Sequence, residues 1–169
     1  MLESVYSLVG KIAAASENVI AVTGPAWDHP SAVDQKDIER YIGEFDEAED
    51  AWRTNEEKLS FQMSYYSNGD KSIGQAWQNV RHAVDVYREC ASDWHDKAGR
   101  FREERLKREK ENLPELNTWP WFNVNDICAV QREALTKRMA DLGEKLESNR
   151  TYVWRGWENP EELRKVLLK

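Results

Sequence analysis

The chain has 169 residues, of which 33% are charged and 40% hydrophobic, and its formal net charge is −7. Eight Trp, six Tyr and four Phe supply too much apolar mass for a disordered chain, while eight Gly and five Pro are too few for the many turns of a sandwich or barrel. The acidic balance disfavours direct nucleic-acid binding, because such domains neutralise phosphates with clustered Lys and Arg.

Residues 2–22 repeat apolar side chains at steps of three and four, which predicts a helix with one apolar stripe. Gly24 and Pro25 are expected to end it. Lys11 interrupts the apolar stretch, so neither a secretory signal nor a membrane span is expected. The stripe carries little shielding charge, and we expect it to pack in a second copy of the chain, as a homo-oligomer. Its apolar positions are Leu2, Val5, Tyr6, Val9, Ile12, Ala13, Val19 and Ile20.

Two seven-residue repeats follow, and they predict long helices over residues 32–66 and 71–112. Ser67 to Asp70 form a turn between them, so the helices are expected to fold back as an antiparallel, coiled-coil-like hairpin in which residue i faces about 137 − i. This register places Trp52 near Asp85 and Phe45 near Ser92. The repeated positions are Ile38, Phe45, Trp52, Leu59 and Tyr66 in the first helix and Ile73, Val80, Tyr87, Trp94 and Phe101 in the second.

Beyond Pro114 the sequence predicts an aromatic loop, a helix over 124–150, a non-helical stretch over 151–158 and a short helix over 160–168. The stripe of the longer of these helices is Cys128, Leu135, Met139, Leu142 and Leu146, with Ile127 and Val130 at its start. No segment alternates polar and apolar residues as a strand would. We therefore predict an all-α protein with one domain over 1–169: a helical bundle built on the long hairpin, with two further packed helices and a short C-terminal helix.

Motifs for metal or nucleophilic chemistry are missing from the sequence. Cys90 and Cys128 are too few for a disulfide framework or a zinc site, and we interpret both as small buried hydrophobes of a reduced, cytoplasmic protein. His82, Glu89 and Asp96 share one line of a helix, but that line is expected to face water, and no Glu-x-x-His pair occurs. We expect no metal and no cofactor, and nothing in the sequence gives a specific reason to propose an enzyme.

Glu49 and Glu56 occupy seam positions where the repeat predicts apolar residues. A buried carboxylate is costly unless it is paired. Either the bundle is splayed there, or the glutamates reach the edge, or Arg and Lys from another helix meet them. The functional alternative is a polar cleft, as in a small helical-bundle enzyme or ligand sensor.

Charge is divided unevenly along the chain. Residues 1–70 carry 14 acidic and 5 basic side chains, a net −9, whereas residues 71–169 carry 17 and 19, a net +2. An acidic run is either a plain solvated face or a patch that steers a basic partner protein. The basic stretch over 97–110 is expected to match acidic residues of 27–40 within the chain. The candidate acidic contact residues are Glu44, Asp46, Glu47 and Asp50.

Five aromatic side chains lie outside the predicted helices, where they either cap the bundle ends or anchor a partner. They are Trp119, Trp121, Phe122, Trp154 and Trp157. Together with the acidic run they predict a non-enzymatic protein–protein interaction module, such as a subunit, an adaptor or an inhibitor or immunity-type accessory protein. A third hypothesis is an acidic mimic that blocks a nucleic-acid-binding protein.

Overall fold

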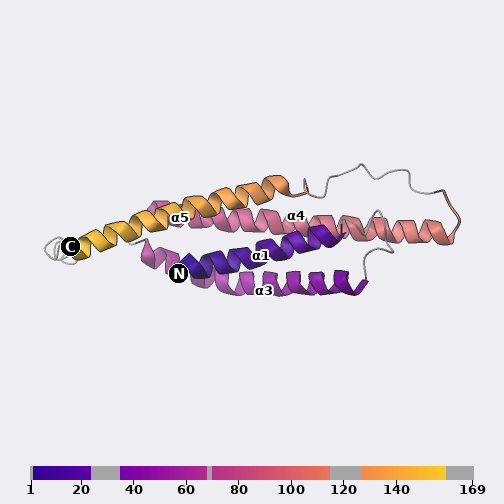
Figure 1. The fold of residues 1–169 in the computed structure, drawn as a ribbon, viewed down its shortest axis with the longest axis horizontal. Coiled ribbons are helices and arrows are strands. Elements are labelled where there is room, and N and C mark those ends of the chain that lie inside the picture. The colour runs from indigo at the N-terminus through magenta and orange to yellow at the C-terminus, as the bar shows by residue number, and fades with distance from the viewer. Residues whose placement is uncertain (1, 24–34, 68–69, 115–126, 159–169) are drawn as a thin grey trace.

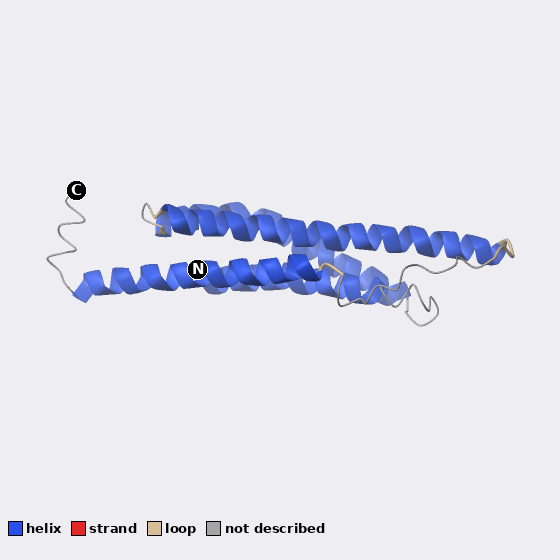
Figure 2. Cartoon of the chain, turned by 90° about the horizontal axis from the view of Figure 1, so that it is seen from above, coloured by secondary structure: helices blue, strands red, loops and turns tan. Residues whose placement is uncertain are grey.

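The computed structural model describes residues 2–23, 35–67, 70–114 and 127–158, and these ranges are almost entirely helical. The helices are α1 (Leu2–Thr23), α3 (Gln35–Tyr66), α4 (Lys71–Lys110) and α5 (Ala129–Glu158). They lie alternately up and down along one long axis (Figure 1), and no strand occurs in the described part of the chain (Figure 2). The predicted all-α bundle is confirmed.

The predicted hairpin is present with its turn where expected; residues 32–34 lie outside the described residues, and α4 ends at Lys110 rather than at 112. The α3 helix ends at Tyr66, and α4 begins at Lys71 after Asp70, whose side chain accepts a hydrogen bond of 2.8 Å from the backbone N–H of Ser72. An acceptor at this position satisfies one of the free N–H groups of the first turn.

The last helix differs from its prediction at both ends. It begins at Ala129, after Cys128 adopts a left-handed φ of 55°, and it continues to Glu158. The prediction that 151–158 is not helical is therefore wrong. One glycine costs a helix only about 1 kcal/mol relative to alanine, so Gly156 does not stop it. The predicted helix over 160–168 lies outside the described residues.

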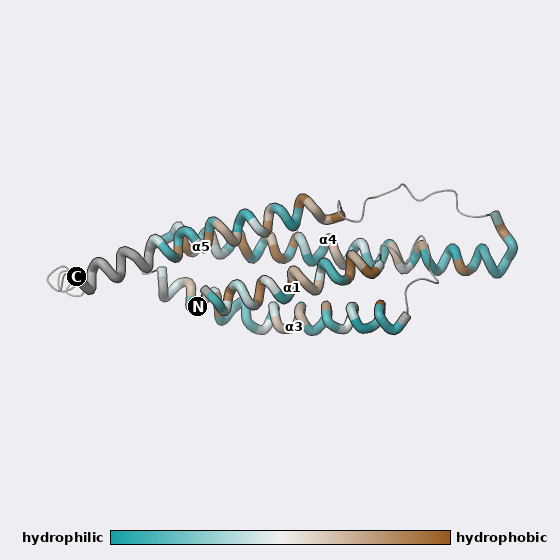
Figure 3. The backbone as a smooth tube through the Cα atoms, viewed as in Figure 1, coloured by the Kyte–Doolittle hydropathy of each residue, from teal (hydrophilic) through white to brown (hydrophobic). Residues whose placement is uncertain are grey.

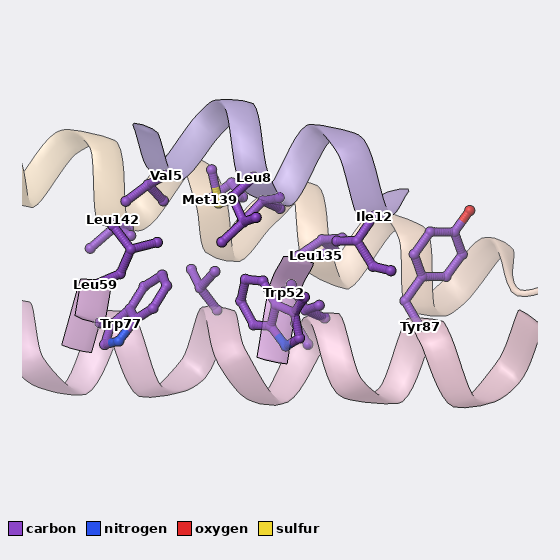
Figure 4. Packing of buried hydrophobic residues seen from close by; sticks show 14 of the residues in the cluster. Val5, Leu8, Ile12, Trp52, Leu59, Trp77, Tyr87, Leu135, Met139 and Leu142 are labelled. Atoms are coloured by element: carbon purple, nitrogen blue, oxygen red, sulfur yellow. The ribbon is translucent and has the colours of Figure 1, made fainter. Parts of the chain in front are cut away.

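The helices share one core, in which α1 packs along both α3 and α4 while α5 packs mainly along α4. The brown segments in Figure 3 follow the inner sides of these helices. At the centre, the rings of Trp52 and Trp77 lie 6.0 Å apart at an interplanar angle of 52° (Figure 4). The heptad prediction is confirmed at the positions that are buried, namely Ile38, Phe45, Trp52, Leu59, Met63, Ile73, Trp77, Val80, Val84, Tyr87, Ala91 and Ala98.

The apolar stripe of α1 is buried inside this same bundle. Val5, Val9 and Ile12 pack in the core that α3, α4 and α5 share. The hydroxyl of Ser16, which also lies on the buried side, donates to the carbonyl of Ile12 at 2.8 Å and so is satisfied within the helix. The face that we expected to bind a second copy is therefore covered by the chain itself.

Two positions depart from the predicted stripes. Tyr6 is exposed, and its hydroxyl lies over Gly143 of α5, where an added Cβ would come within 2.7 Å of that oxygen. Val130 is also exposed, because α5 begins only at Ala129 and its inward face starts with Leu135. Because both residues are apolar or aromatic, the periodic pattern alone predicts that they lie in the core.

By length and composition, the segment Glu3–Thr23 of α1 is apolar enough to cross a membrane. Core helices and N-terminal signal sequences pass the same test, and here the apolar side of α1 packs against its neighbours. The prediction that no membrane-spanning stretch exists is not supported by this measure.

A disulfide joins Cys90 of α4 to Cys128 at the start of α5, with their Cα atoms 6.0 Å apart. The interpretation of both residues as separate buried thiols is therefore wrong, because the turn before α5 brings Cys128 against the side of α4. Disulfides persist mainly in oxidising compartments. The predicted cytoplasmic location relied on reduced cysteines and loses that support, although the location itself remains a prediction.

Tyr87 provides a test of core burial. Burial raises the pKa of its hydroxyl to about 12, with a further rise from Glu17 and a partial opposing effect from Arg132. The folded state thus favours the neutral phenol. The stability that this preference contributes is present in full below pH 10 and is lost as the pH rises through 12. We expect the free energy of unfolding to fall by up to about 3 kcal/mol over this range.

The measurement is urea unfolding at several alkaline pH values, with Tyr87→Phe as the comparison. The variant keeps the ring but has no proton to lose, so only the wild type should lose this stability, and the variant should gain up to about 3 kcal/mol relative to it as the pH rises from 10 through 12. An identical pH dependence in both proteins would show that Tyr87 is not buried as described.

Candidate interaction site

The two seam glutamates are met by arginines of α4. Glu49 forms an ion pair with Arg88, and it also accepts a 2.7 Å hydrogen bond from Arg53 on its own helix. About two turns further along, Glu56 accepts a hydrogen bond of 3.1 Å from Arg81. Of the alternatives stated for these positions, the structure shows the last: basic residues from another helix meet the glutamates.

These pairs also measure the register of the hairpin. The residue numbers of Glu49 and Arg88 add up to 137, and so do those of Glu56 and Arg81. The same holds for Ser60 and Trp77, whose indole donates a 2.7 Å hydrogen bond to the Ser60 hydroxyl. The expected register is confirmed along this whole length. Polar contacts therefore line the outer edge of the α3–α4 hairpin, while the tryptophans fill its inner side.

Asp85 lies half-buried beside this edge. Burial raises the pKa of its carboxyl, the nearby Glu56 raises it further, and the indole N–H of Trp52 partly opposes the rise. The effect of Trp52 on this pKa reflects the closeness of Trp52 to Asp85 that the register predicts. A carboxyl with a raised pKa inside a cleft is a common sign of catalysis, but structural ion-pair networks produce it as well. Here Arg81 and Glu56 supply such a network.

The predicted cleft at Glu49 is a small, half-open pocket of about 130 Å³. Sites for small molecules usually measure roughly 300–1,000 Å³. The carboxylate of Glu49 is already neutralised by two guanidinium groups, and Glu56 does not line the pocket. This geometry is too small and too well compensated to favour the enzyme or ligand-sensor hypothesis. The pocket is lined by Phe45, Glu49, Arg88, Glu89, Ser92 and Asp93.

The predicted acidic contact residues form what we call the acidic patch: Glu44, Asp46, Glu47 and Asp50. All four are exposed on α3. No ion pair among the described residues uses any of them, whereas their neighbour Glu49 is paired twice. The surface of α3 at this point therefore presents charge that the bundle itself does not neutralise.

The predicted aromatic anchors divide into two groups. Trp119, Trp121 and Phe122 lie outside the described residues, and their role remains a prediction. Trp154 and Trp157 were expected in a loop, but they lie on the last turns of α5. That end of α5 extends past the turn between α3 and α4 in both views (Figures 1 and 2).

The basic stretch over 97–110 occupies the last third of α4. Its helix terminates with Lys107, Arg108 and Lys110, whose charges favour the negative end of the helix dipole. Arg108 also pairs with Glu104 at 3.0 Å. Most of the opposing residues expected to match this stretch, at 27–34, lie outside the described residues.

Within the described ranges, no three His, Cys, Asp or Glu side chains gather as a metal ion would require. His82, Glu89 and Asp96 all face solvent, as predicted. The feature that sequence reasoning missed is the disulfide. Spacing could not reveal it, because the two cysteines are 38 positions apart and the sequence between them includes a segment without a periodic pattern.

Comparison of the chain with protein families, with curated proteins and with solved structures finds no match.

Proposed function

We propose that this chain is a non-enzymatic α-helical interaction module, a subunit, adaptor or inhibitor that binds a basic protein through the acidic patch. The observation that carries the proposal is the exposure of four carboxylates on one helix with no compensating cation among the described residues. Uncompensated charge of one sign steers a partner of opposite sign and raises its association rate. Glu49 and Glu56 are paired with arginines and therefore add no unpaired charge to this surface.

The loop residues Trp119, Trp121 and Phe122 are proposed as further anchors of the same partner, since buried Trp and aromatic side chains supply most of the energy at protein interfaces. Trp154 and Trp157 are proposed in the same role from the end of α5. The acidic-mimic hypothesis is a special case, in which the basic partner is itself a nucleic-acid-binding protein.

The test is purification of the tagged full chain with its bound proteins, in parallel for three forms. We expect a basic protein to be retained by the wild type and lost, by at least about tenfold, when Asp46, Glu47 and Asp50 are all changed to Lys. Glu144→Lys on the exposed side of α5 is the matched control and should retain it. Retention should also weaken as salt is added. Equal retention by the wild type and the triple variant would contradict the proposal.

A further inference from the structure

The side of α3 that faces away from the core combines charge with exposed aromatic surface. Phe45, Trp52 and Leu59 face inward, so residues half a turn away form the opposite side. We call this the outer stripe: Glu47, Asp50, Thr54, Phe61 and Tyr65, all exposed and spaced by three, four or seven residues.

Phe61 and Tyr65 are 74% and 79% exposed, which is unusual for large aromatic side chains next to one another on one helix. Exposed apolar surface rimmed by charge is typical of an interaction site. The stripe from Glu47 to Tyr65 spans about 27 Å at 1.5 Å per residue, which is the length of a five-turn helix. A matching partner is therefore a helix that carries basic and apolar residues together.

The chain itself contains such a helix at the end of α4. No residue of α4 beyond Ala98 is buried, and this end extends past α1, α3 and α5 in Figures 1 and 2. Leu106 is 45% exposed on it, and Leu113 just beyond it is also exposed. This projecting end, residues 97–113, therefore presents leucines on a segment that the described helices do not cover.

The charges of the two surfaces are complementary. Residues 97–110 hold seven basic and three acidic side chains, a net +4, whereas residues 44–57 of α3 hold seven acidic and one basic, a net −6. On α3 the acidic residues Glu47 and Asp50 precede Phe61, and on the projecting end the basic stretch over 97–110 precedes Leu113 and contains Leu106. A parallel alignment that sets Leu113 opposite Phe61 places residues 97–110 opposite residues 45–58, so the basic stretch meets the acidic one.

We propose that the projecting end of α4 in one copy docks on the outer stripe of α3 in a second copy. Because α3 and α4 are antiparallel within a chain, a two-fold axis across the long direction of the bundle makes the α4 of one copy parallel to the α3 of the other. Both copies then make the same contact, and the dimer closes without forming a filament. The inference relies on the proposed function, since it names a second copy as the basic partner of the acidic side of α3.

The experiment is sedimentation of the full, oxidised chain from micromolar to sub-millimolar concentration. We expect the wild type to approach twice its 19.8 kDa mass and to dissociate with added salt. Phe61→Ala should weaken dimerisation by at least about tenfold, and the helical content should be unchanged because the side chain is exposed. Val130→Ala, another exposed apolar position, is the matched control and should dimerise as the wild type does.

Charge exchange gives the sharper result. One variant carries Glu47→Lys with Asp50→Lys, and the other carries Lys107→Glu with Lys110→Glu. Each alone should dimerise more weakly than the wild type, because the exchange lowers the net charge of residues 44–57 from −6 to −2 or that of residues 97–110 from +4 to 0. An equal mixture should associate more strongly than either variant alone, since the unchanged basic end of the first then meets the unchanged acidic stretch of the second.

Three outcomes would overturn the proposal: a wild type that stays monomeric, a wild-type dimer that tolerates Phe61→Ala, or variants that fail to associate when mixed. None of them bears on retention of a different basic protein, which the purification measures separately. A wild type that dimerises but retains no other protein would contradict the proposed function and leave the dimer standing, whereas the lysine changes at Glu47 and Asp50 are expected to weaken both.

Discussion

Removal of the disulfide between Cys90 and Cys128 is expected to lower the free energy of unfolding by about 4 kcal/mol. The bond closes a loop whose ends are 38 residues apart, and a cross-link of this span removes roughly that much conformational freedom from the unfolded chain. It also holds Cys128 in a left-handed conformation that only glycine adopts without cost. Without the link, the turn into α5 loses that constraint.

The measurement is urea unfolding of the wild type and of the double variant Cys90→Ser, Cys128→Ser, each with and without a dithiol reductant. Reductant should shift the wild-type midpoint to that of the variant and should leave the variant unchanged. A wild type that unfolds at the same urea concentration in both conditions would show that the bond contributes little, or that it does not form.

Trp52→Ala is expected to reduce stability by about 4 kcal/mol, as truncation of a large buried aromatic residue does. Trp52 is 1% exposed and packs against Trp77 at the centre of the core, so the neighbouring helices cannot collapse fully into the space it leaves. Phe61→Ala on the same helix is the matched control, measured at a concentration low enough for the chain to be monomeric. There an exposed aromatic side chain should change stability by no more than about 0.5 kcal/mol.

Both variants are compared with the wild type by urea unfolding, with helical content checked by circular dichroism. Similar losses for Trp52→Ala and Phe61→Ala would mean that the inner and outer sides of α3 are assigned wrongly. A loss confined to Phe61→Ala would mean that the helix is rotated by half a turn.

Much of the fold was predictable because heptad spacing is a property of the chain alone. The repeat from Ile38 to Leu59 and the one from Ile73 to Tyr87 each mark a buried side, and a four-residue turn leaves the two helices only an antiparallel arrangement. Once that turn is known, the register follows, and the pairing of Glu56 with Arg81 obeys it.

The remaining features depend on contacts between distant parts of the chain, which local periodicity does not encode. The stripe of α1 is equally suited to its own bundle and to a second copy, and only the packing of α3 and α4 against it decides between them. Cys128 follows the periodicity of α5 but belongs to the turn before it. The α5 helix also continues beyond its predicted end, because a single glycine such as Gly156 costs a long helix only about 1 kcal/mol.

The candidate site was only partly predictable for the same reason. Sequence composition identifies the acidic run on α3, but it cannot show that Glu49 is neutralised by Arg88 while Asp50 is left exposed. Nor does the sequence show that Phe61 and Tyr65 face away from the core, since an aromatic residue near a heptad is ordinarily assigned to the interior.

The central claim is that α3 and α4 lie antiparallel in one register, which turns Trp52 and Trp77 inward and the acidic patch outward. Its most direct test is nuclear magnetic resonance with specifically labelled tryptophans. Cross-relaxation should connect ring protons of Trp52 with those of Trp77, and the indole N–H of Trp77 with the side chain of Ser60. Indole protons that connect only to residues within one turn of their own helix would contradict the hairpin and everything built on it.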